Sequence, residues 1–275
     1  MRNTSQTKKA FSMIELIFVI VILGIVSSIA ANIIAQVYES YIVQRAQYRA
    51  TSKTELALTQ IANRLRYAIP GTVGFRSDTG GTFKFITEAN SGNDKVLQWV
   101  SYDGDSFEAI DSDTNRKPGW SGFCDIDAYV ANSTNLPTPG SNLDLAKTII
   151  SNLGGDIANA KIIFPNNMAY GIDDATGETI TLDNEIHGKI YERYKLAWTS
   201  YALSVEGGDL YLYYNFMPDV GAPLDNASKQ LLLKNVTNFR FKGSEGSMRI
   251  KICKEEQIGM NANSTIHACK EKVIF

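Results

Sequence analysis

The sequence predicts an α+β protein in which a long N-terminal helix packs on an antiparallel β-sheet domain. Two observations predict this fold: residues 11–69 contain no proline and keep a helical pattern, whereas residues 72–275 alternate apolar and polar side chains between glycine-rich turns. The 275 residues carry 27 lysines and arginines against 29 aspartates and glutamates, for a formal charge of −2. This balance excludes a broadly basic chain, so we expect no nucleic-acid partner.

The first half of the helix, residues 11–35, is mostly apolar and carries a single charge, Glu15. Such a helix is about 37 Å long, and the hydrocarbon core of a bilayer is roughly 30 Å thick. Arg2, Lys8 and Lys9 precede it, and positive charge favours the cytoplasmic side, so we expect the N-terminus inside and the rest of the chain exported. A cleaved secretory signal is the alternative. The apolar run exceeds the roughly 7–15 residues of a signal core, which favours a retained transmembrane helix.

Glu15 has two interpretations. A carboxylate in hydrocarbon costs about 2.5–3.5 kcal/mol even on insertion scales, so it needs a partner. In the first interpretation Ser12 and Glu15 form a capping box, the S-x-x-E pattern that satisfies free backbone N–H groups of the first helical turn. In the second, Glu15 pairs with a cation inside the membrane or inside an assembly of such helices. The spacing leaves both open.

The second half of the helix, residues 36–69, is expected to be amphipathic. Its apolar residues recur at intervals of three and four, the spacing of one helix face: Leu58, Ile61, Leu65 and Ala68. We predict a single helix from Ser12 to Ala68, ended by Pro70-Gly71. The amphipathic half should pack on the domain that follows.

Residues 70–275 are expected to form that β-rich domain. Turn sequences flanked by alternating stretches predict three hairpins, with turns at 103–105, 206–209 and 243–246. Three hairpins favour an antiparallel sheet over parallel βαβ units.

Three further elements are predicted within this domain. Residues 82–87 alternate like a strand, and residues 143–153 form a short helix with Ser141 as its N-cap. Residues 111–139 are rich in Asp, Asn, Ser and Pro, which is typical of a long surface loop.

The cysteines indicate one crosslink. Cys253 and Cys269 are close in sequence and could form a disulfide in an exported domain, where the surroundings are oxidising. Cys124 is left over and is expected to be a buried thiol. A zinc site formed by these three cysteines and His267 is a minor alternative, because no C-x2-C pair supports it.

A calcium site is the other metal hypothesis. Asp111, Asp113 and Asn115 have the alternate spacing of oxygen ligands in a calcium-binding loop. Arg116 and Gly122, however, stand where the EF-hand pattern needs glycine and a bidentate glutamate. We expect no metal or cofactor. No nucleophile elbow, phosphate-binding loop or H-E-x-x-H helix occurs in the sequence, so we expect no enzyme.

The segment Lys8-Lys9-Ala10-Phe11-Ser12-Met13-Ile14-Glu15-Leu16, with the unbroken Ile/Val/Leu run after it, resembles the N-terminus of type IV prepilins and type II secretion pseudopilins. The family usually has glycine at the position of Ala10, and alanine is the next smallest side chain. The resemblance implies that a prepilin peptidase cuts between Ala10 and Phe11 and that Phe11 is then N-methylated. It also implies that Glu15 pairs with the N-terminal amine of a neighbouring subunit during assembly.

The resemblance also implies a pilin-like fold and a division of the chain into four parts. These are a leader (1–10), the transmembrane half of the helix (11–35), its amphipathic half (36–69) and a periplasmic or extracellular domain (70–275). The implied location is the bacterial inner membrane, with one span, and then a periplasmic or extracellular filament. The implied partners are other pilin or pseudopilin subunits, the peptidase and the inner-membrane assembly platform.

The order of apolar strands in residues 201–241 is weakly similar to that of the large J-type minor pseudopilin. With the size of the chain, this similarity suggests a minor subunit that forms the tip of a type II secretion pseudopilus or primes its assembly. Two alternatives remain at this point: a membrane-anchored periplasmic enzyme or ligand-binding protein with an uncleaved signal anchor, and a pilus subunit for adhesion or DNA uptake.

Overall fold

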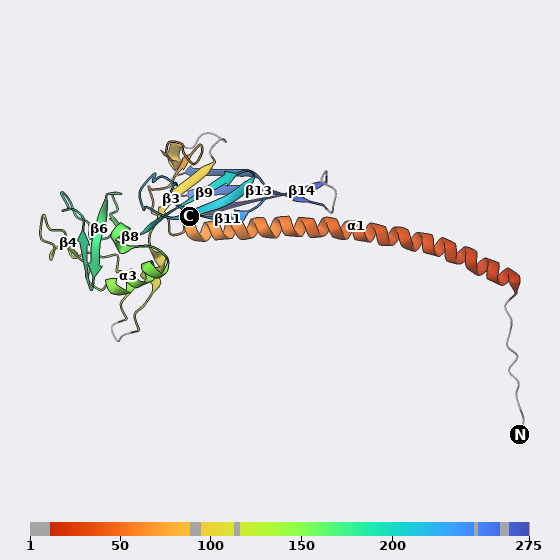
Figure 1. Cartoon of the computed structure of the whole chain (residues 1–275), viewed down its shortest axis with the longest axis horizontal. Coiled ribbons are helices and arrows are strands. Elements are labelled where there is room, and N and C mark those ends of the chain that lie inside the picture. Colours follow the sequence, from red (N-terminus) through yellow and green to blue (C-terminus); the bar gives the residue numbers. More distant parts are fainter. Residues whose placement is uncertain (1–11, 89–94, 113–115, 245–246, 259–263, 275) are drawn as a thin grey trace, which may run out of the picture. The chain divides into compact units, whose positions relative to one another are not determined.

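The computed structural model describes residues 12–88, 95–112, 116–244, 247–258 and 264–274 (Figure 1). The chain divides into two compact units. The first comprises Met1–Arg49 and Glu256–Ile266, and the second comprises Ala50–Glu255 and His267–Phe275. The α+β fold class is confirmed, because a long N-terminal helix is followed by antiparallel sheets.

The long helix α1 (Met13–Leu65) has 53 residues and ends three residues earlier than predicted. After Leu65 the chain makes a tight turn in which the Ala68 N–H donates to the Leu65 carbonyl (3.0 Å). Ala68 then forms an antiparallel bridge with Ser101, and the Ile69 N–H donates to the Val100 carbonyl (2.9 Å). Pairing with a strand therefore takes the backbone out of the helix before Pro70 could end it.

The last four turns of α1 lie in the second unit and bury one face. Thr54 is buried on that face, and its hydroxyl donates to the Ala50 carbonyl (2.7 Å), so its polar atom is satisfied inside the apolar surroundings. The buried residues recur at intervals of three and four, as the amphipathic pattern predicted. They are Ala50, Thr54, Ala57, Leu58, Ile61, Ala62 and Leu65.

A six-stranded antiparallel sheet and a three-stranded sheet share a core with this helix face. The strand orders are β11-β10-β9-β3-β1-β2 and β12-β13-β14. Leu58 and Leu65 pack in the same hydrophobic cluster as Trp99 and Ile250, so one core joins α1 to both sheets. The strands are β1 (Gly74–Arg76), β2 (Lys84–Phe85), β3 (Val96–Ser101), β9 (Thr199–Glu206), β10 (Asp209–Phe216), β11 (Ser228–Leu233), β12 (Val236–Ser244), β13 (Ser247–Gln257) and β14 (Thr265–Ile274).

A second core lies around Trp120, under a five-stranded antiparallel sheet in the order β4-β7-β6-β5-β8. Helix α3 (Leu143–Asn152) contributes Leu143 and Ile150 to it. This second sheet was not predicted from the sequence. The remaining elements are β4 (Asn135–Pro137), β5 (Lys161–Ile163), β6 (Ala169–Thr176), β7 (Thr179–Leu182), β8 (Lys195–Ala197), α2 (Gly104–Glu108) and the 3-10 turns η1 (Ile86–Glu88) and η2 (Ile157–Asn159).

Two of the three predicted hairpins are confirmed. Strands β9 and β10 meet with Glu206 opposite Asp209, and Gly207 and Gly208 between them have positive φ angles of 58° and 86°, as a tight two-residue turn requires. Strands β12 and β13 also pair as a hairpin.

The hairpin predicted around residues 103–105 is wrong, because helix α2 begins there. The Asp103 carboxylate accepts a hydrogen bond from the Ser106 N–H (3.1 Å) and acts as the N-cap of that helix. The strand predicted at 82–87 is also too long, since only Lys84–Phe85 is a strand and η1 follows it.

Two further corrections concern α3 and the loop before it. Its N-cap is Asn142, whose side chain accepts from the Leu145 N–H (3.2 Å), rather than Ser141. Ser141 instead accepts a hydrogen bond from the Ser121 N–H (3.0 Å) and so holds the preceding loop. Residues 111–139 are not wholly a loop, because β4 lies near their end and pairs with β7.

Candidate functional site

The N-terminal end of α1 holds the residues singled out by the sequence. The Ser12 hydroxyl oxygen accepts a hydrogen bond from the Glu15 N–H (3.4 Å), and the Ser12 carbonyl accepts from Leu16 (3.2 Å). Ser12 therefore supplies one half of the capping box. Among the residues that the structure describes, none donates a hydrogen bond to the Glu15 carboxylate or forms an ion pair with it, and its side chain is exposed. Ala10 and Phe11, the predicted processing site, lie outside the described residues.

The helix surface that follows is apolar on every side and uncovered. No residue is buried in the most apolar 18-residue stretch of α1. Among the described helices, α1 alone is long and apolar enough to cross a membrane. Its exposed side chains include Ile14, Phe18, Ile22 and Val26, each more than half exposed. Exposing an apolar surface of this extent to water is unfavourable, so lipid or other helices must cover it.

Residues 5–31 match the family model of the prokaryotic N-terminal methylation motif. Over this segment the match supports a relationship to type IV prepilins and pseudopilins. No curated protein and no solved structure matches the chain significantly. The prepilin-type motif and the apolar helix support a pilin-like or pseudopilin subunit anchored in the membrane by one N-terminal helix. They also favour a structural role over catalysis.

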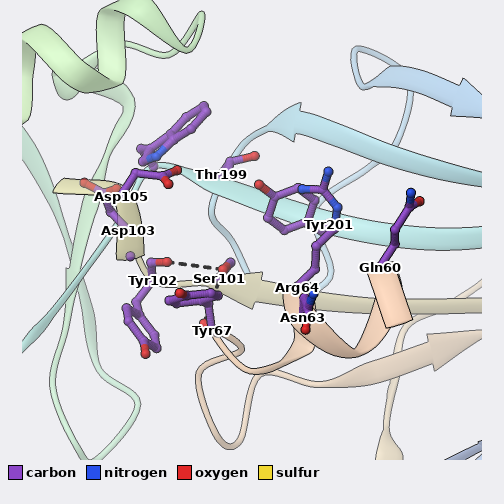
Figure 2. A pocket seen from close by; sticks show the side chains of 12 residues that line it. Gln60, Asn63, Arg64, Tyr67, Ser101, Tyr102, Asp103, Asp105, Thr199 and Tyr201 are labelled. Carbon is purple, nitrogen blue, oxygen red and sulfur yellow. Dashed lines mark hydrogen bonds between the residues drawn. The ribbon is translucent and has the colours of Figure 1, made fainter. Parts of the chain in front are cut away.

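In the second unit, a polar pocket of about 340 Å³ lies beside the end of α1 (Figure 2). Arg64 lies over the ring of Tyr201, with its guanidinium carbon 5.3 Å from the ring centre. The Ser101 hydroxyl donates to the Tyr67 carbonyl (3.2 Å), and the Tyr67 ring meets the Tyr102 ring edge-on at 5.3 Å. The side chains in this pocket thus contact one another, and they fasten the end of α1 to β3 and β9. Sequence reasoning missed the pocket because its lining comes from separate segments of the chain.

Asp103 is the buried charge at one end of this pocket, with 3% of its surface exposed. One carboxylate oxygen caps α2, and the other is buried with no hydrogen-bond partner among the described residues. Burial raises the pKa of Asp103 above the ordinary aspartate value, and its hydrogen bonds with Ser106 oppose that rise. The folded protein therefore binds a proton at Asp103 more tightly than the unfolded chain does.

We expect Asp103→Asn to become more stable relative to the wild type as the pH rises. The raised pKa stabilises the wild-type fold below about pH 4, and that contribution is lost as the pH rises through the folded-state pKa. Asparagine has no proton to lose and still caps α2 well. The melting temperatures of the two proteins across the acidic to neutral range measure the effect. Asp156→Asn is the matched control, because Asp156 caps η2 from an exposed position, and equal trends for both variants would contradict the assignment.

Cys253 and Cys269 are joined by a disulfide that links β13 to β14. In this state neither sulfur is a thiolate that could bind zinc together with Cys124. Cys124 is buried, and its thiol donates to the Tyr191 carbonyl (3.1 Å). Burial raises the pKa of Cys124 to about 11, which keeps it protonated and unreactive at neutral pH.

Removal of the disulfide in a Cys253→Ser/Cys269→Ser variant is expected to lower the free energy of unfolding by about 3 kcal/mol, because a closed loop of this size restricts the unfolded chain. Denaturant unfolding with and without reductant measures the loss. Reductant should destabilise the wild type and leave the double variant unchanged. Equal stability of the oxidised wild type and the variant would refute the prediction.

The calcium hypothesis gains no support from the described residues. The Asp111 carboxylate accepts a hydrogen bond from the Asn142 side-chain amide (2.6 Å), which ties it to the N-cap of α3. Asp113 and Asn115 lie outside the described residues. Across the part of the chain that the structure describes, no group of three or more His, Cys, Asp and Glu residues is placed to hold a metal ion.

Proposed function

We propose that this chain is a structural subunit of a pilus-like filament and, more specifically, a minor subunit of a type II secretion pseudopilus that forms its tip or primes its assembly. The observation that carries the proposal is the methylation motif at the start of an uncovered apolar helix. The size of the chain and the weak J-type similarity of residues 201–241 favour the minor role over the repeating major subunit.

In this proposal the chain first enters the inner membrane with its N-terminus in the cytoplasm. A prepilin peptidase cuts between Ala10 and Phe11, and Phe11 is N-methylated. The assembly platform then lifts the helix out of the bilayer. Its apolar side chains leave lipid and are buried again against the helices of other subunits, where close packing replaces lipid contacts.

In this proposal Glu15 determines how neighbouring subunits align along the filament. In an apolar bundle its carboxylate needs a cation, because an unpaired charge in hydrocarbon costs about 2.5–3.5 kcal/mol. The N-terminal amine of a neighbouring subunit supplies that cation when the two helices have the correct axial offset. The ion pair therefore fixes the register between subunits, while the apolar surface supplies most of the association energy.

The mature N-terminus tests the proposal. Mass spectrometry of protein isolated from its native membrane should find a chain that begins at Phe11 and carries one extra methyl group. Ala10→Gly should be processed at least as completely, and Ala10→Leu should leave the leader attached, because the peptidase site needs a small residue. An intact Met1, or a cut after Ala31, would support the signal-anchor or signal-peptide alternatives and refute the proposal.

A further inference from the structure

A second cavity of the second unit, about 630 Å³ in volume, lies between the end of β3 and the edge of the five-stranded sheet. Its walls come from α2, from the loop at residues 120–123 and from strands β5 and β8. This volume is in the range of small-molecule binding sites, roughly 300–1,000 Å³. The cavity is separate from the methylation motif, and the filament function proposed above does not use it.

Six aromatic side chains line the cavity. Phe107 and Phe123 line the cavity with 44% and 41% of their surfaces exposed, although both are large apolar residues. Trp120 lies beneath Phe107, with their ring centres 4.7 Å apart, and is itself buried. Exposed aromatic side chains gathered around a concavity are typical of a surface that binds an apolar group.

One cation is set into this apolar wall. The Lys195 ammonium nitrogen lies 3.8 Å from the centre of the Tyr102 ring, and the side chain is half-buried. None of the ion pairs between described residues includes Lys195. Burial lowers the pKa of Lys195, and no carboxylate contributes to the shift. Arg193, exposed at the rim, adds a second positive charge, and none of the described residues that line the cavity is acidic.

We infer that this cavity binds a small apolar carboxylate, such as an aromatic acid, with the carboxylate on Lys195 and the apolar part against Phe107 and Phe123. The ligand carboxylate would accept a charge-assisted hydrogen bond from the half-buried Lys195 ammonium. The apolar part of the ligand would bury the exposed surfaces of Phe107 and Phe123. Lys195 is the half-buried cation of the wall, whereas Arg193 is exposed at the rim, so the apolar part of the cavity offers one positive charge. One positive charge matches a carboxylate better than the double charge of a phosphate. Charge complementarity therefore determines the ligand class.

The test compares two probes that differ only in charge, 3-(4-fluorophenyl)propanoate and its neutral amide. Their binding to the full chain in phosphatidylcholine nanodiscs is followed by fluorine NMR, with empty nanodiscs as the blank. We expect the acid to bind roughly five- to tenfold more tightly than the amide. Equal affinities, or no binding of the acid at millimolar concentration, overturn the inference.

Three variants separate the charge from the apolar wall. Lys195→Gln should reduce the affinity for the acid to that for the amide, whereas Lys195→Arg should keep most of the preference. Phe107→Ala should lower the affinity for both probes by the same factor, because it removes apolar contact only. Lys189→Gln is the matched control, since Lys189 also lies over a tyrosine ring, that of Tyr191, but does not line the cavity. A preference for the acid that persists in a folded Lys195→Gln protein overturns the inference.

Discussion

Glu15→Ala is expected to abolish incorporation of the chain into filaments while leaving membrane insertion and processing intact. Insertion depends on the apolar run, which the substitution makes more apolar. Processing depends on the residues around Ala10 and Phe11. In the proposed assembly, incorporation depends on the pairing of Glu15 with a cation of a neighbouring subunit, and alanine cannot form that pair. The structure is consistent with this separation, because the Ser12 cap accepts from the Glu15 backbone N–H, which alanine retains.

Fractionation of cells into membrane and sheared filament, followed by immunoblotting, measures the effect. The variant should remain in the membrane fraction with a processed N-terminus and be at least tenfold depleted from filaments. A tenfold change corresponds to about 1.4 kcal/mol, and leaving the amine of the neighbouring subunit unpaired in the apolar bundle costs more than that. Glu15→Gln should behave like the alanine variant, because it retains shape but not charge. Glu39→Ala, at another exposed glutamate of α1, should assemble normally. Wild-type filament levels for Glu15→Ala would show that the carboxylate has no role in assembly.

Local features of the fold were predictable because their signals lie within short stretches of sequence. The apolar run and the three-and-four spacing that predict α1 can be seen directly in the sequence. The β9–β10 turn requires positive φ angles, which Gly207 and Gly208 adopt. The same local chemistry also explains the error at residues 103–105. Aspartate and glycine are typical of turns, but aspartate is equally an N-cap, and Asp103 caps α2.

Two pairings of the five-stranded sheet, β4–β7 and β5–β8, could not be predicted because these strands are short and distant in sequence. Ile163 of β5 pairs with Lys195 of β8, and Leu136 of β4 pairs with Ile180 of β7. A strand of three residues shows no measurable alternation. Only its burial around Trp120 makes such a strand stable, and burial is a property of the assembled core.

The candidate sites divide in the same way. The processing and assembly residues form one contiguous segment, so the sequence alone singled out Ala10, Phe11 and Glu15. The cavity around Lys195 draws its residues from distant parts of the chain, and no spacing rule connects Lys195 with Phe107 or Tyr102. The sequence shows that Lys195 is present, but only the fold shows that no carboxylate among the described residues forms an ion pair with it.

Leu58→Ala is expected to destabilise the docked part of α1 strongly, with a loss of about 2–5 kcal/mol in the free energy of unfolding. Leu58 is 2% exposed and packs in the cluster that joins the helix to both sheets. Its truncation removes apolar contact and leaves a cavity where the helix meets the sheets. Because domains of ordinary stability unfold at a cost of about 5–15 kcal/mol, the loss should be visible as a large shift of the denaturation midpoint.

Leu56→Ala provides the matched control, since it makes the same chemical change two residues away on the same helix. Leu56 is 60% exposed, so its truncation should alter the free energy of unfolding by no more than about 0.5 kcal/mol. Helix propensity changes equally in the two variants and cancels from the comparison. Denaturant unfolding followed by tryptophan fluorescence measures both, because Trp99 lies in the affected core. Equal losses for the two variants would mean that the buried face does not stabilise this part of α1. The packing of the amphipathic half on the domain would then be refuted.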